Sequence, residues 1–429
     1  MARQILLCTV GGSHQPIIAA IQSSSPDYVC FFCTERDPGT NAPGSVDQVT
    51  GEGNVIKASY NDRSPTLPNI PIQADLRDDQ FKVKIVPADD LDGAYSAMRD
   101  AIAKLAKRFP NANCIADYTG GTKTMTAALV CAALEKDDFE LQIVAGARTN
   151  LVNVQDGTEQ AMTASVARLR LRRAMAPYLG AWERFAYHEA AEGLKGIRIV
   201  AGAVDIQLLQ IAKVLSGALA LWDNFDHAGA FDLIKVYSKR VALCFPNIFN
   251  TLSILTNKKN TQREPALLFD LWLNAERRAA QGRFDDAIAR WYRLMEWTAQ
   301  WQLRTKLNAD TSDFPRELLP KDANVAPARD GKIKIGLWQA WQVVGEQESL
   351  KGPAQDFFTE YGGEFLNLLE VRNKSILAHG FRPVTASDWW QEVSNWTDEK
   401  FLPVLRALAK EVDLKTEPQQ LPTAFPEDI

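Results

Sequence analysis

The chain has 429 residues, which at about 100–200 residues per domain predicts two or three domains. Hydrophobic residues make up 46% and charged residues 24%, an ordinary globular balance, and the net charge of −5 argues against a protein that coats nucleic acid through charge alone. The six cysteines are too sparse for a disulfide framework, and no run approaches the roughly 20 apolar residues that span a bilayer, so we expect a cytoplasmic protein without a membrane segment.

Short apolar runs alternate with helical patterns in the first third of the sequence. In chain order, strands are expected at 5–10, 28–33, 54–58, 82–86, 112–117 and 139–145, and helices at 15–22, 92–108 and 122–136. This alternation predicts a parallel sheet with helices on both faces. We therefore expect a Rossmann-like α/β domain over residues 1–162. Cys30 and Cys33 are spaced as in a metal or redox motif, but side chains three apart on a strand face opposite sides, so both thiols should be core residues.

Long helical patterns replace the strands from residue 165 onward. Helices are expected at 165–178, 182–194, 203–222, 228–244, 265–281, 284–307, 336–347, 353–360, 363–378, 386–393 and 397–412. We assign 163–195 to connecting helices, 196–413 to an all-helical domain and 414–429, which holds three prolines, to a mobile tail. The many tryptophans of this half are expected in its core, with stacking on nucleic-acid bases as the alternative.

Two glycine-containing loops each join an expected strand to an expected helix. The residues concerned are Gly11, Gly12, Ser13, His14 and Gln15 in the first loop and Thr119, Gly120, Gly121, Thr122, Lys123 and Thr124 in the second. Glycines allow close backbone approach to a ligand, and the amides that open a helix attract anions. Since ligands bind at the carboxyl ends of parallel strands, two such loops favour a phosphate-bearing ligand over simple corner turns.

Neither loop fits the usual nucleotide motifs. A Walker A loop needs glycine at the positions of Asp117 and Thr122, and neither loop reads G-x-G-x-x-G, so ATP hydrolysis and NAD binding are disfavoured. The segment 117–125, Asp-Tyr-Thr-Gly-Gly-Thr-Lys-Thr-Met, together with Gly11-Gly12-Ser13, resembles the CRISPR-associated Rossmann fold (CARF) domain of type III ancillary ribonucleases. The resemblance implies that two such domains pair and bind cyclic oligoadenylate. It implies that Thr122 and Lys123 contact the ligand's backbone or ribose, that residues 11–15 line the other wall, and that His14 lies at the pocket rim. The alternative for His14 is a residue that caps a helix or faces solvent.

A second motif lies in the all-helical half, where Arg372 and His379 are separated by six residues. At 3.6 residues per turn this spacing puts both on one face of the helix expected at 363–378, with Gly380 at its end. With Asn373 after the arginine, the segment resembles the R-x(4–6)-H signature of HEPN ribonucleases. The resemblance to these ribonucleases also includes the upstream helix expected at 287–300, with its Trp-Tyr-Arg-x-x-Glu-Trp pattern. The resemblance covers nearly the whole chain and implies an endoribonuclease of CRISPR antiviral defence with Arg372, Asn373 and His379 in its active site.

The chemistry of these residue types fits RNA cleavage. The 2′-hydroxyl attacks its own phosphate, which requires a base, an acid and a cation for the developing charge. His379 can be base or acid, Arg372 can clamp the phosphate, and Asn373 can position His379 or the substrate. Because one chain offers a single suitable histidine, we expect a homodimer that cuts single-stranded RNA with no metal and no other cofactor, with cyclic oligoadenylate as allosteric activator.

Three alternatives stay open at this point. Arg372 and His379 can be an ordinary surface ion-pair residue and a helix cap. The chain can be a non-catalytic sensor whose helical domain docks a partner. The CARF-like pocket can also cleave its own activator, with Lys123 and the nearby hydroxyls supporting attack by a 2′-hydroxyl.

Overall fold

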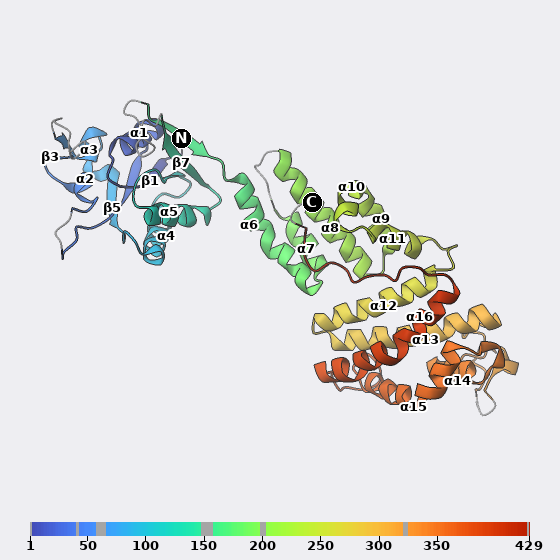
Figure 1. The fold of residues 1–429 in the computed structure, drawn as a ribbon. Coiled ribbons are helices and arrows are strands. Elements are labelled where there is room, and N and C mark those ends of the chain that lie inside the picture. Colours follow the sequence, from blue (N-terminus) through green and yellow to red (C-terminus); the bar gives the residue numbers. More distant parts are fainter. Residues whose placement is uncertain are drawn as a thin grey trace. The chain divides into compact units, whose positions relative to one another are not determined.

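A computed structural model describes residues 2–39, 43–56, 66–146, 158–197, 203–320, 325–426 and 429. It divides into two compact units, Met1–Arg170 and Leu171–Ile429 (Figure 1). The first is a mixed α/β unit and the second is helical, which confirms the expected fold class. The division falls inside a helix of the segment that was expected to connect the domains.

The first unit is built on a six-stranded sheet with the order β5-β2-β1-β6-β7-β8. The strands are β1 (Gln4–Thr9), β2 (Tyr28–Cys33), β5 (Phe81–Ile85), β6 (Asn113–Asp117), β7 (Phe139–Ala145) and β8 (Gln160–Ala164). The five strands from β5 to β7 pair in parallel, as expected. The edge strand β8 pairs antiparallel with β7 and was not expected, because its largely polar, exposed sequence lacks an apolar run.

Alternate residues of β1 enter two separate cores. Ile5 and Leu7 pack in the core that includes residues of α4 (Leu91–Arg108) and α5 (Lys123–Leu134), whereas Leu6 and Cys8 pack with residues of α1 (Gln15–Ser24). The period of two is that of a strand buried on both faces. The short elements α2 (Asp47–Thr50), β3 (Asn54–Ile56), β4 (Leu67–Pro68) and α3 (Ile70–Gln73) complete the unit. Residues 57 and 58 of the strand expected at 54–58 lie outside the described residues.

The two cysteines of the C-x-x-C sequence lie in different cores, as the strand argument predicts. Cys30 belongs to the core beside α4 and α5, and Cys33 belongs to the core beside α1. Burial raises the pKa of each thiol to about 12. The two thiols are therefore protonated core groups.

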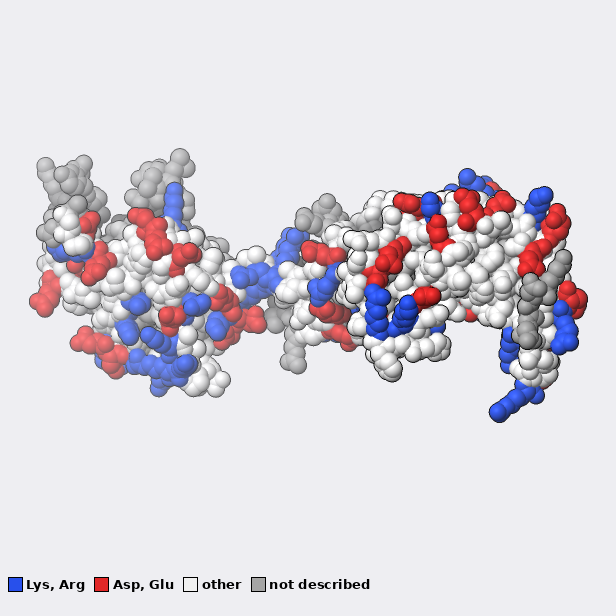
Figure 2. Space-filling model, turned by 90° about the horizontal axis from the view of Figure 1, so that it is seen from below, with Lys and Arg blue, Asp and Glu red and all other residues white. Residues whose placement is uncertain are grey.

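The second unit consists of helices. They are α6 (Ala167–Leu179), α7 (Tyr187–Lys195), α8 (Ala203–Asp223), α9 (His227–Ile234), α10 (Ser238–Cys244), α11 (Ile248–Thr256), α12 (Arg263–Ala280), α13 (Phe284–Leu307), α14 (Leu337–Glu346), α15 (Pro353–Asn373) and α16 (Leu402–Glu411), with π-helical segments Asp388–Ser394 and Thr397–Phe401. The helix expected at 228–244 is split into α9 and α10, and α11 was not expected. On the face seen in Figure 2, basic and acidic side chains are interspersed over both units.

Aromatic side chains fill the core of the second unit. Trp291, Trp341 and Trp389 are fully buried, and Trp291 and Trp341 donate hydrogen bonds from their indole nitrogens to Thr397 and to the Met295 carbonyl. These partners fix each indole in one orientation. The expectation that most tryptophans belong to the core agrees with this packing, although Trp390 is 45% exposed.

The segment that follows α16 packs against the helices, in contrast to the mobile tail expected from residue 414. Leu414 and Leu421 are buried, the Tyr187 hydroxyl donates to the Pro422 carbonyl at 2.8 Å, and Phe425 meets Trp182 edge-on. The three prolines suggested mobility, but apolar residues between them supply enough contacts to hold the segment in place. Residues 427 and 428 of the expected tail lie outside the described residues.

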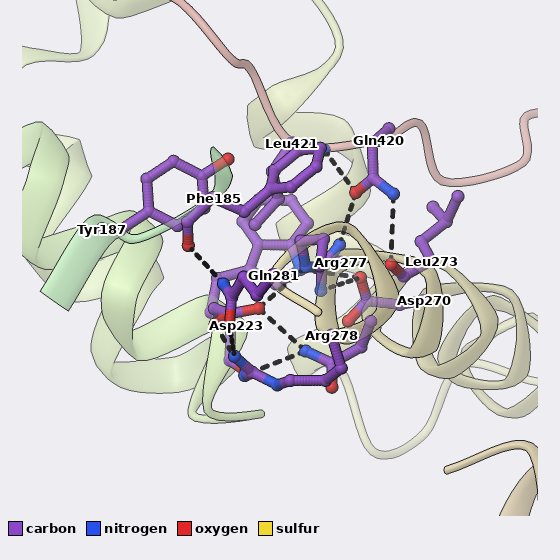
Figure 3. A network of polar contacts seen from close by, with 12 residues as sticks. Phe185, Tyr187, Asp223, Asp270, Leu273, Arg277, Arg278, Gln281, Gln420 and Leu421 are labelled. Atoms are coloured by element: carbon purple, nitrogen blue, oxygen red, sulfur yellow. Dashed lines mark hydrogen bonds and ion pairs between the residues drawn. The ribbon is translucent and has the colours of Figure 1, made fainter. Parts of the chain in front are cut away.

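A buried polar network ties the same segment to α8 and α12 (Figure 3). Arg277 and Arg278 donate to the Asp223 carboxylate at 2.8 and 2.6 Å. Arg277 also donates to Gln420 at 2.7 Å, and Gln420 donates to the Leu273 carbonyl. Each buried charge thus has charged or polar partners, as burial requires.

Candidate functional site

The two glycine loops of the first unit lie side by side at one edge of the sheet. They follow β1 and β6, which are neighbours in the sheet and run parallel. The chain places β2 and β5 on one side of this pair and β7 on the other, so the loops lie at the switch point where open α/β sheets bind ligands. The sequence-based expectation that both loops share one edge is met.

Direct backbone contact between the loops explains two of the glycines. A Cβ atom on Gly11 would lie 2.5 Å from the amide nitrogen of Gly121, and one on Gly120 would lie 2.3 Å from the Thr9 carbonyl oxygen. The Thr9 hydroxyl donates to the Gly120 carbonyl at 2.5 Å. Gly11 and Gly120 are therefore required for the loops to pack together, whatever binds there.

Some side chains of the two loops form hydrogen bonds within the protein, and others are exposed to solvent. The Thr122 hydroxyl accepts from the Met125 amide as the cap of α5 and donates to the Ala88 carbonyl, and the Thr119 hydroxyl accepts from the Val144 amide. Ser13 and Lys123 are exposed, as is Gly12, while Gln15, Gly121 and Thr124 are half-buried. His14 is only 4% exposed and directly precedes α1, and its role in a ligand site stays a prediction.

Asp117 fixes the base of the second loop. Its carboxylate accepts from the Thr119 amide at 3.0 Å and from the Gln142 side chain at 3.1 Å. Burial raises the pKa of this carboxyl, although both hydrogen bonds act against the rise. Asp117 is thus a supporting residue beneath Thr119 and not a ligand-facing acid.

The candidate catalytic residues lie at the end of α15. The helix ends at Asn373, so the prediction that Arg372 and His379 share one helical face is wrong. His379 lies in the exposed turn that follows, and its amide donates to the Asn373 carbonyl at 3.4 Å. The structure therefore brings the backbone of His379 back to Asn373 by a turn.

A chain reversal replaces the continuation of the helix. The Lys374 carbonyl accepts from the Arg382 amide at 3.0 Å, and the Ser375 carbonyl accepts from the amides of Ala378 and Gly380. A Cβ atom on Gly380 would lie 2.0 Å from the Lys374 carbonyl oxygen. Gly380 is required because the chain passes directly over the end of the helix, seven residues after the helix itself has ended.

The Arg372 guanidinium is held by an aromatic ring. Its carbon lies 4.3 Å from the ring centroid of Tyr292 on α13, and its Nη1 donates to the Asn373 amide oxygen at 3.3 Å. Within the described residues, no carboxylate lies within ion-pair distance of Arg372. The guanidinium is therefore a positive group with most of its donors available to an anion.

The segment after His379 is anchored by Asp388. Its carboxylate accepts from the Arg382 guanidinium and from the amide and hydroxyl of Thr385, each at 2.8 Å. Burial alone would raise the pKa of Asp388, but the bonds from Thr385 and Arg382 lower it on balance. Sequence reasoning missed Asp388 and Tyr292, although Tyr292 lies within the Trp-Tyr-Arg pattern that was singled out.

The described residues offer neither a metal-binding cluster nor a membrane-spanning helix. These residues contain no group of three or more histidine, cysteine, aspartate or glutamate side chains that could hold a metal ion. Their helices include none with the length and apolar character needed to cross a membrane.

Part of the second unit is similar to a known protein family. Residues 256–399 match the family model of the Csm6 HEPN domain, and this range contains Arg372, Asn373 and His379. The match agrees with the HEPN resemblance noted from the sequence.

A solved structure shares the fold of the chain. Csm6 of Enterococcus italicus bound to cyclic hexa-2′-fluoro-hexa-dAMP matches 97% of this chain and 96% of its own, with 12% identity and a TM-score of 0.56. Can2 of Sulfobacillus thermosulfidooxidans in complex with cyclic tetra-adenylate matches 57% of this chain and 69% of its own, with 11% identity and a TM-score of 0.23, too low to support an argument. A comparison with curated protein sequences found no match.

Proposed function

We propose that this protein is a CARF–HEPN endoribonuclease of the cytoplasm that cyclic oligoadenylate activates and that, as a homodimer, cuts single-stranded RNA without a metal ion. Support for the activator comes from the similarly folded Csm6 structure, which holds a cyclic hexanucleotide analogue. Support for RNA as the substrate comes from the HEPN family match. The roles of individual residues rest on the geometry of the turn after α15.

The observation that carries the proposal is the convergence of three chemical groups at that turn. Arg372 presents a guanidinium without a carboxylate partner among the described residues, Asn373 contacts it, and His379 is exposed beside Asn373. A surface salt-bridge arginine would be neutralised, as Arg382 is by Asp388. A guanidinium without a carboxylate partner and an exposed histidine on the turn that follows it suit a phosphodiester instead.

These groups supply what cleavage by internal attack requires. One histidine takes the proton of the 2′-hydroxyl while the 2′-oxygen bonds to phosphorus. The bond from phosphorus to the 5′-oxygen breaks, and that oxygen takes a proton from a second histidine, which leaves a 2′,3′-cyclic phosphate and a 5′-hydroxyl. Arg372 neutralises the charge of the phosphorane, and Asn373 orients Arg372. Since each chain contributes one His379, the proposal requires two chains at one cleft.

The paired loops of the first unit form the proposed activator site. Ser13 and Lys123 are exposed there and can approach a phosphate backbone, whereas the Thr122 hydroxyl already has two partners. The amide groups that open α5 add partial positive charge. We therefore assign backbone contacts to Gly11, Gly12, Gly120 and Gly121, and the charged contact to Lys123.

The test is cleavage of a fluorogenic single-stranded RNA with and without cyclic tetra-adenylate or cyclic hexa-adenylate. One of the two rings should accelerate cleavage, a chelator should leave the rate unchanged, and His379→Ala should lower it at least about 100-fold. His188→Ala changes an exposed histidine of α7 and serves as the matched control. Full cleavage by His379→Ala, or none by the wild type with either ring, would refute the proposal.

A further inference from the structure

A single aromatic side chain lies against the proposed catalytic arginine. The Tyr292 ring centroid is 4.3 Å from the Arg372 guanidinium carbon, the shortest of the cation–ring separations measured among the described residues. At this distance the negative face of a ring attracts a cation by about 0.5–2 kcal/mol. The contact joins two helices that are distant in sequence, α13 and α15.

Tyr292 is itself held firmly. It is half-buried against the core of the second unit. Its neighbour Trp291 is fully buried and bonded to Thr397, and three residues further along α13 the Met295 carbonyl accepts from Trp341. The backbone that carries the ring is therefore fixed on both sides. A fixed ring restricts the rotamers of the long arginine side chain that lies against it.

The kind of contact matters for what Arg372 can do. A carboxylate partner would neutralise the guanidinium and occupy its donors, as Glu296 does for the nearby Arg293 on α13. A ring face attracts the cation but accepts none of its in-plane N–H bonds. Arg372 uses one such donor, towards Asn373, and the others stay available.

The phenol also stays neutral. Burial, and then the charge of Glu296, raises the pKa of Tyr292, while Arg372 acts in the opposite direction. Among the described residues no hydrogen-bond partner of the Tyr292 hydroxyl is found, so the ring and not the hydroxyl makes the contact that matters.

We infer that Tyr292 is a positioning residue for RNA cleavage, whose ring fixes Arg372 with its charge and donors free for the scissile phosphate. This inference rests on the proposed function. Loss of the ring should let the guanidinium adopt other rotamers or pair with a carboxylate, and both changes weaken stabilisation of the phosphorane. Loss of the hydroxyl alone should change little.

The experiment compares Tyr292→Ala, Tyr292→Phe and Arg372→Ala in the full-length chain, with saturating cyclic tetra- or hexa-adenylate, whichever activates the wild type. Tyr292→Ala should lower kcat about 3- to 30-fold with little change in KM, and Tyr292→Phe should retain the wild-type kcat. Tyr361→Ala is the matched control, because it removes another half-buried tyrosine of this domain whose ring faces a cation, Lys400.

Each outcome separates the inference from the proposed function. If Arg372→Ala abolishes cleavage but Tyr292→Ala does not lower kcat, Tyr292 has no positioning role. An equal loss in Tyr292→Phe would assign the effect to the hydroxyl and overturn the inference, as would an equal loss in Tyr361→Ala, which would indicate a general effect on folding. If Arg372→Ala cleaves as well as the wild type, the proposed function fails first and the inference with it.

Discussion

The amide of His379 donates a hydrogen bond to the carbonyl of Asn373 at 3.4 Å. The candidate histidine is therefore tied to the end of α15 by the backbone of a turn. Turns of this kind depend on a few close backbone approaches, so the geometry of the site should be sensitive to single atoms. Four expected outcomes follow from this and from related contacts in the second unit.

Gly380→Ala should impair cleavage. The added Cβ atom would lie 2.0 Å from the Lys374 carbonyl oxygen, so the turn must open and His379 must move. A displacement of about 1 Å lowers rates by about 10- to 100-fold. Gly363→Ala is the matched control, because a Cβ atom there meets nothing within 4 Å and alanine favours the helix. Wild-type cleavage by Gly380→Ala would contradict the role of the turn.

Phe381→Ser should weaken the proposed homodimer and cleavage together. Phe381 is 92% exposed, and Ile376 and Leu377 of the same turn are 63% and 52% exposed, a concentration of apolar surface next to His379. Such surface commonly marks an interface, and the proposed mechanism needs a second His379 close by. Sedimentation should show a shift towards monomer for Phe381→Ser, and none for Leu243→Ser, which changes an 83% exposed leucine of α10. A stable, active Phe381→Ser dimer would place the interface elsewhere.

The sequence predicted regular elements better than it predicted where they end. The bounds of α13 agree with prediction at both ends, because Gly282 precedes the helix and the apolar spacing runs unbroken to Leu307. In α15, the helical spacing of apolar residues continues beyond Asn373 to Ile376 and Leu377, yet the helix ends at Asn373 and the chain turns. The reversal depends on the contact between Gly380 and Lys374, which no local pattern reveals.

In the candidate sites, too, features set by the local sequence were predicted, whereas contacts between distant segments were not. Adjacent strands and glycine turns were enough to place the two loops at one sheet edge. The local sequence could not show that the Thr122 hydroxyl donates a hydrogen bond to the Ala88 carbonyl, because Ala88 is remote from Thr122 in the chain. Nor could it show that His14 is buried, because burial depends on tertiary packing. The Tyr292–Arg372 contact also joins residues 80 positions apart and has no sequence signature.

Glu276→Gln should stabilise the protein at alkaline pH. Burial, and then the charge of Asp398, raises the pKa of Glu276 on α12 to about 7. The unfolded carboxyl has a pKa of about 4.3, so the folded state binds the extra proton between these values and wild-type stability falls as pH rises through that window. The variant lacks this loss of stability. In urea unfolding, the free energy of unfolding of Glu276→Gln should exceed that of the wild type by about 1–3 kcal/mol at pH 8 and should equal it near pH 4.

The matched control for this pH dependence is Glu399→Gln. The Glu399 side chain is 57% exposed. Its replacement should leave the change in the free energy of unfolding between pH 4 and pH 8 the same as in the wild type. A Glu276→Gln variant that is destabilised at pH 8 would mean that the carboxylate makes a favourable interaction in the folded state.

Gln420→Ala should destabilise the second unit although it lies nine residues from the last residue of the chain. Its side chain accepts from the buried Arg277 at 2.7 Å and donates to the Leu273 carbonyl (Figure 3). Truncation leaves the Arg277 donor without this acceptor in a buried site, which costs about 1–3 kcal/mol. Gln419→Ala changes the exposed neighbour and should leave the unfolding midpoint unchanged. Equal midpoints for the two variants would show that the segment after α16 contributes nothing to stability, and that its packing against α12 does not hold in solution.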